Sequence, residues 1–178
     1  LADYENALDR HYFKRSLVSL SLKGSDVRFL RDLLKSEIDH RNILNIIEAE
    51  AVGIDGDGIV EMLIPGGRLI PERAFPSIAA GGKNAALDIL RGANRFDIQE
   101  FEGVLAESKS VNSLDPVITW FNAREHALLQ RMSYLHPVSA LPVVNYVAMK
   151  VQEVADLRLI VRGRLAGLPA EVLEAHIL

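Results

Sequence analysis

The chain has 178 residues and a net charge of −4, and 49% of its residues are hydrophobic against 25% charged. This composition is typical of a globular protein with a packed core, and the acidic balance gives no broad basic field of the kind that binds nucleic acid. The absence of cysteine excludes disulfides, thiolate metal sites and cysteine nucleophiles.

No stretch of the sequence approaches the roughly 20 apolar residues that cross a bilayer, and no signal-peptide pattern opens the chain. We therefore expect no direct membrane span, and another protein would have to hold the chain at any membrane where it works. The chain begins with Leu rather than Met, so we expect it to be a piece of a longer protein.

Apolar residues at helical spacing predict two helices at the start of the chain, residues 2–20 and 26–52. We expect Asp26 to cap the second helix and Gly53 to end it in the left-handed conformation. Carboxylates alternate with the apolar positions of this helix, and we interpret them as a solvated face. They are Glu37, Asp39, Glu48 and Glu50.

The middle of the chain is more broken. Gly-rich and Pro-rich turns are expected at 55–58, 65–67 and 80–82. Short helices are expected between them, at about 57–63, 71–79 and 84–91, with a longer helix at about 97–110. The strand-like runs are too short to build a sheet, so the predicted fold class is all-α.

Two more long helices are predicted at 115–133 and 140–166, followed by a short one within 169–178. Asp115 suits the N-cap of the first, and Gly167 suits the end of the second. Each long helix carries an apolar stripe, and we expect that of the first helix to be buried. The stripes are Val117, Ile118, Phe121, Leu128, Leu129 and Met132 in the first, and Val144, Val147, Ala148, Val151, Ala155, Leu157, Ile160, Val161 and Leu165 in the second.

Two segments of the sequence share the same pattern of residue types. "NILNIIEAEAVGI", residues 42–54, and "DLRLIVRGRLAGL", residues 156–168, share a small polar start, an aliphatic pair and a Gly-aliphatic end, 114 residues apart and without a gap. The same offset places the predicted helix 2–20 on the later one at 116–134.

The repeated helix order predicts two helical-bundle units with pseudo-symmetry, residues 1–113 and 114–178. The alternative is that two amphipathic helices ending in Gly look alike without any repeat. The first unit would carry an extra segment, about residues 65–113.

Motifs that would carry chemistry are incomplete. "DGDGIVE", residues 55–61, lacks the spacing of a calcium loop, and "AGGKN", residues 80–84, lacks the residues of a phosphate loop. The five His residues form no compact ligand pair. We therefore predict no catalytic, metal-binding or cofactor-binding residues.

Three arginines, Arg158, Arg162 and Arg164, lie near the end of the last long helix. They either stabilise the negative end of the helix dipole by a few tenths of a kcal/mol each or form a docking face for an acidic partner. Gly163 costs about 1 kcal/mol relative to Ala inside a helix. Either another backbone or helix packs closely there, or the glycine is simply tolerated.

Residues 145–177 resemble the closing signature of the C subunit of the archaeal and bacterial A/V-type ATP synthase, which is the relative of the d subunit of eukaryotic V-ATPase. The pattern is carried by Glu153, Asp156, Leu157, Arg158, Ile160, Gly163, Arg164, Gly167, Leu168 and Pro169. An earlier helix of that family is matched by Glu37, Ile38, Asp39 and Asn42, and "LIPGGRL", residues 63–69, is also similar.

This resemblance implies three similar helical units arranged as a funnel, of which the chain would hold the last two. It implies a non-catalytic rotor subunit that links the central-stalk coiled-coil subunit to the membrane proteolipid ring during proton- or sodium-linked ATP synthesis or hydrolysis. The protein would then be peripheral, on the cytoplasmic side of the cell membrane, and part of a complex.

Two other hypotheses remain open. The chain is alternatively an all-α regulatory module that binds an acidic partner or nucleic acid through Arg158, Arg162 and Arg164. In the second hypothesis, the chain is an enzyme whose site is assembled from scattered carboxylates and histidines.

Overall fold

The computed structural model describes residues 2–21, 24–54, 56–94 and 96–174. Within these residues the chain forms α-helices, one 3-10 helix and no strand, which confirms the predicted all-α class. The chain divides into two compact units, Leu1–Leu114 (unit 1) and Asp115–Leu178 (unit 2). That the two units are copies of one repeat, the last two of three, stays a prediction.

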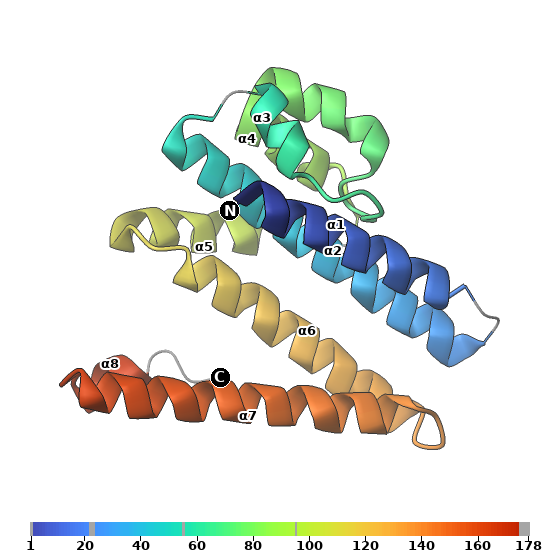
Figure 1. The fold of residues 1–178 in the computed structure, drawn as a ribbon, viewed down its shortest axis with the longest axis vertical. Helices are drawn as coiled ribbons and strands as arrows, with labels where there is room; N and C mark the ends of the chain where they lie inside the picture. Colours follow the sequence, from blue (N-terminus) through green and yellow to red (C-terminus); the bar gives the residue numbers. More distant parts are fainter. Residues whose placement is uncertain (1, 22–23, 55, 95, 175–178) are drawn as a thin grey trace. The chain divides into compact units, whose positions relative to one another are not determined.

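Unit 1 opens with a helical hairpin, in which α1 (Ala2–Ser19) lies against α2 (Ser25–Val52) (Figure 1). The N-cap of α2 is Gly24, so the prediction that Asp26 caps this helix is wrong. Gly53 ends it with φ 76°, as predicted. The buried core of the hairpin consists of Phe13, Leu34, Ile38 and Ile64, with Leu17 and Leu20 packed against it.

The remaining helices of unit 1 are α3 (Gly56–Met62), the 3-10 helix η1 (Glu72–Ala74), α4 (Phe75–Arg91) and α5 (Ile98–Val111). Gly56 lets α3 touch α4, because a Cβ there would lie 1.7 Å from the carbonyl oxygen of Ala79. The turn expected at 80–82 is a kink inside α4, where Gly82 has φ 54° and ψ −139°. Because Gly82 is non-helical, α4 consists of two helical segments that meet at this kink, which agrees with the two helices expected here.

Unit 2 consists of α6 (Asp115–Leu135), α7 (Leu141–Leu165) and α8 (Ala170–Glu174) (Figure 1). Asp115, predicted as an N-cap, is the first residue of α6. α8 seats its buried Leu173 on Gly163 of α7, where an added Cβ would lie 2.3 Å from the Leu173 side chain. Close packing at Gly163 is thus the reason that a glycine is found inside this helix.

The ends of α2 and α7 have the same hydrogen bonds, which are those of a Schellman C-cap. In α2, the N–H of Gly53 donates to Glu50 O (3.1 Å) and that of Ile54 to Ala49 O (2.9 Å). In α7, each corresponding residue lies 114 positions later: Gly167 donates to Arg164 O (3.1 Å) and Leu168 to Gly163 O (2.9 Å). Gly167 has φ 77° and, as predicted, ends the helix.

Candidate interaction surfaces

The three predicted arginines are exposed near the end of α7. Arg158 and Arg162 are four residues apart and share one helix face. Arg164 lies about 200° around the helix from Arg162, since successive residues rotate by about 100°. The structure therefore brings two of the three together and presents the third to another side.

The apolar stripe predicted for α7 is largely exposed. Only Leu141 and Gly163 of this helix are buried. The large exposed members of the stripe are Val147 (53%), Val151 (65%), Leu157 (55%), Val161 (57%) and Leu165 (85%), and the smaller Ala155 is also exposed. In α6 the expected stripe is partly buried, through Val117, Phe121 and Leu129. A two-helix unit with a short third helix offers α7 too little surface to cover it.

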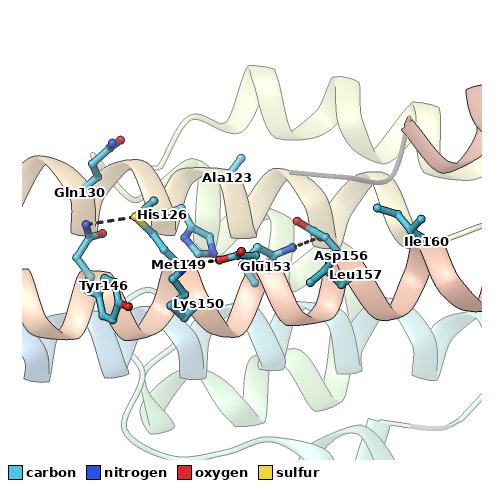
Figure 2. A pocket seen from close by; sticks show the side chains of 12 residues that line it. Ala123, His126, Gln130, Tyr146, Met149, Lys150, Glu153, Asp156, Leu157 and Ile160 are labelled. Carbon is cyan, nitrogen blue, oxygen red and sulfur yellow. Dashed lines mark hydrogen bonds and ion pairs between the residues drawn. The ribbon is translucent and has the colours of Figure 1, made fainter.

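A groove of about 570 Å³ lies between α6 and α7 of unit 2 (Figure 2). Its walls mix apolar side chains with a row of polar ones on α7. The lining residues on α6 are Ala123, His126 and Gln130. Those on α7 are Asn145, Tyr146, Met149, Lys150, Gln152, Glu153, Asp156, Leu157 and Ile160.

The polar side chains of this groove interact along one helix. Lys150 pairs with Glu153, and Gln152 Nε2 donates to Asp156 Oδ1 at 2.8 Å (Figure 2). Asn145 donates weakly to the sulfur of Met149 at 3.7 Å, while its Oδ1 is buried without a hydrogen-bond partner in the described part of the chain. The groove thus holds two carboxylates and one unsatisfied acceptor oxygen.

In unit 1, residues 63–70 lie against α2 and bond to its polar side chains. Asp39 holds this segment through three backbone N–H groups. Oδ2 accepts from Arg68 (2.9 Å) and Leu69 (2.8 Å), and Oδ1 accepts from Ile70 (3.0 Å). Gly67 is required here, since a Cβ would lie 2.2 Å from Asp39 Oδ1.

Two amides and one guanidinium complete the attachment of this segment. Asn42 pairs with the backbone of Ile64, donating to its carbonyl (2.9 Å) and accepting from its N–H (2.7 Å). Asn45 donates to Met62 O at 2.9 Å, and Arg10 donates to Leu63 O at 3.0 Å. The segment is irregular in structure, yet polar contacts hold it at both ends.

Asp39 is 1% exposed, so its assignment to a solvated face is wrong. Burial raises the pKa of the Asp39 carboxyl above its ordinary value, and the three backbone N–H groups oppose this without offsetting it. The sequence signal that could have identified it is the Asp-x-x-Asn spacing, which places Asp39 and Asn42 on one side of α2.

In the described parts of the chain, no group of three or more His, Asp or Glu residues is arranged to hold a metal ion. A search of the same residues finds no helix that is long and apolar enough to cross a membrane.

The described residues form an all-helical protein whose long helices carry exposed apolar and basic side chains and a groove. Comparison with known proteins identifies the family of the chain. Residues 1–176 match the family model described as ATP synthase (C/AC39) subunit, and the chain belongs to that family.

Its curated relatives are named as the C subunit of A-type ATP synthase. The relative from Haloferax volcanii is 31% identical, over 99% of this chain and 49% of the relative. That from Halorubrum lacusprofundi is 32% identical, over 99% and 49%, and that from Archaeoglobus fulgidus is 28% identical, over 98% and 48%. The chain spans about half the length of these relatives, and no solved structure matches it.

Proposed function

We propose that the chain is part of a non-catalytic rotor subunit of an A/V-type ATP synthase. In this role it links the central-stalk coiled-coil subunit to the membrane proteolipid ring, at the cytoplasmic side of the membrane. The observation that carries the proposal is the family match across residues 1–176, together with relatives named as the C subunit of A-type ATP synthase.

The helical architecture suits such a role. Transmission of torque requires a stiff body with broad contacts, which packed helices provide. Arg158 and Arg162 are exposed, and their guanidinium groups make no hydrogen bond or ion pair with the described residues. Charges of this kind steer and orient an acidic partner more than they add affinity. We therefore assign the Arg158–Arg162 face to the contact with the central stalk.

The test is binding of the intact protein to the purified central-stalk coiled-coil subunit, measured by calorimetry at two salt concentrations. We expect saturable binding that weakens with salt and that the double variant Arg158→Glu/Arg162→Glu weakens by about tenfold or more. The matched control is Arg28→Glu/Arg31→Glu, two exposed arginines of α2, which should leave the affinity unchanged.

Absence of binding to the stalk subunit would contradict the proposal. Equal affinity of both double variants would keep the rotor role and remove the arginine face from it. If the Arg158→Glu/Arg162→Glu variant instead lost binding to an acidic partner outside the ATP synthase, the alternative of an all-α regulatory module would replace the rotor role.

A further inference from the structure

Two residues of α2 bind a segment of the same chain in unit 1. The residues 114 positions later line the groove of unit 2. In unit 1, Asp39 and Asn42 of α2 hold residues 63–70 by main-chain hydrogen bonds. The residues 114 positions later are Glu153 and Asp156 of α7. Both line the groove between α6 and α7.

Three further correspondences support this register. The C-cap hydrogen bonds of α2 and α7 coincide at the same offset. The buried pair Ala49 and Ile59 of unit 1 corresponds to the buried pair Gly163 and Leu173 of unit 2. The starts of α3 and α8, at residues 56 and 170, differ by the same 114.

The occupant of the unit 1 position shows what chemistry the position selects. It is a non-helical segment whose consecutive N–H groups reach one carboxylate, with Gly66 (φ 111°) and Gly67 allowing close approach. Its apolar Ile64 enters the core. A helix could not make these contacts, because most of its N–H groups are already bonded internally.

The groove of unit 2 offers acceptors to such a segment. Glu153 and Asp156 accept hydrogen bonds when ionised and donate none, and Asn145 Oδ1 is a buried acceptor without a partner in the described chain. The apolar part of the wall includes Tyr146 (61% exposed) and Met149 (52% exposed). Complementarity therefore favours an occupant that brings N–H donors and apolar side chains.

We propose that the α6–α7 groove binds an extended segment of another protein chain. The segment presents consecutive backbone N–H groups to Glu153 and Asp156 and packs apolar side chains on Tyr146 and Met149. This interaction is separate from the arginine face proposed for the central stalk and does not depend on the rotor role.

The probe is a fluorescent peptide with the sequence of residues 62–71, MLIPGGRLIP, titrated with the intact protein. We expect saturable binding by fluorescence anisotropy, and the variant Glu153→Ala/Asp156→Ala weakens it by about tenfold or more, since even one lost hydrogen bond to a charged group costs a factor of this order. The variant Glu153→Asp/Asp156→Asn copies the unit 1 pair, so it should bind at least as tightly as the unaltered protein. Exposed Glu48 supplies the control variant, Glu48→Ala, which should leave affinity unchanged.

A second peptide tests the main-chain contact directly. N-methylation of the two amides that correspond to Leu69 and Ile70 removes their donors, so this peptide should bind more weakly by about tenfold or more. Circular dichroism of each protein variant shows whether its helices are intact.

Several results would overturn the proposal. One is that the methylated peptide binds as tightly as the unmethylated one. Another is that a helical peptide with the sequence of residues 26–45 binds more tightly than the peptide of residues 62–71. A third is absence of saturation up to about 1 mM peptide, combined with protection of Tyr146 and Met149 from oxidation in the intact protein without peptide. This result would assign the groove to another part of the same protein.

Discussion

Gly163 has very little room around it in unit 2. A Cβ at this position would lie 2.3 Å from Leu173 Cδ2, and Leu173 is 4% exposed. Any side chain here must displace α8 from α7, whereas the neighbouring Arg162 is exposed and can be shortened without such an effect.

We therefore expect Gly163→Leu to lower the free energy of unfolding by about 1–3 kcal/mol, the usual cost of overpacking. Arg162→Ala should change it by less than about 0.5 kcal/mol. Urea unfolding of both variants measures the difference, and equal midpoints would remove the close-packing explanation of Gly163.

Asp39 makes the stability of unit 1 depend on pH. Since burial raises the pKa of its carboxyl in the folded protein, the folded state binds more protons than the unfolded state between the ordinary pKa and the raised one. The contribution of this group to stability is therefore fully present below the ordinary pKa of about 3.9 and is lost as pH rises through the raised value.

Asp39→Asn tests this dependence. The amide has one acceptor oxygen where the carboxyl has two, so N–H groups of residues 68–70 lose partners and stability falls by about 1–3 kcal/mol. The loss should be larger at pH 4 than at pH 7, because only the wild-type protein gains stability on acidification at this position. A loss that is independent of pH in urea unfolding would contradict the raised pKa.

At the scale of secondary-structure elements, residues 63–70 act as part of the core of unit 1 although they form no helix. Asn42 is fully buried and uses both ends of its amide on Ile64, which is 2% exposed. Removal of this side chain leaves a buried N–H and a buried C=O without partners.

We expect Asn42→Ala to cost about 2–4 kcal/mol, from two unsatisfied backbone groups, and to speed hydrogen exchange of the Ile64 amide. Asn45→Ala removes one half-buried bond to Met62 O and is the control, with a smaller cost. If the two variants had the same stability and the same exchange at Ile64, the segment would not depend on Asn42.

Helix positions were predictable because hydrophobic spacing and glycine stops act locally. Gly53 and Gly167 end their helices as predicted, since only a residue that tolerates positive φ fits there. The cap of α2 was missed because Gly24 takes the position from Asp26. The break at Gly82 was predictable because a glycine pair interrupts a helical pattern.

For the molecule as a whole, burial was much less predictable than helicity. Val147 and Val151 are four residues apart, as are Leu34 and Ile38 of α2, yet the first pair is exposed and the second buried. Periodicity reports which residues share a helix face, but not whether the chain supplies a partner for that face. The groove between α6 and α7 was missed for this reason.

The polar residues that hold residues 63–70 were identifiable only in part. The resemblance to a known family singled out Asp39 and Asn42, but their roles come from contacts 22 to 31 residues along the chain. Such contacts depend on the tertiary fold and leave no trace in local spacing. The arginines of α7 are exposed, which is the common case for charged side chains, and their role in binding a partner stays a prediction.

The attachment of residues 63–70 also determines whether proteases can cleave this segment. Arg68 is exposed and would ordinarily mark a tryptic site, but the amide that follows it, that of Leu69, is bonded to Asp39. Cleavage requires the backbone around the scissile bond to leave its own hydrogen bonds and extend into the protease. The Arg68–Leu69 bond should therefore survive in the folded protein, and digestion at this loop would report that unit 1 has opened.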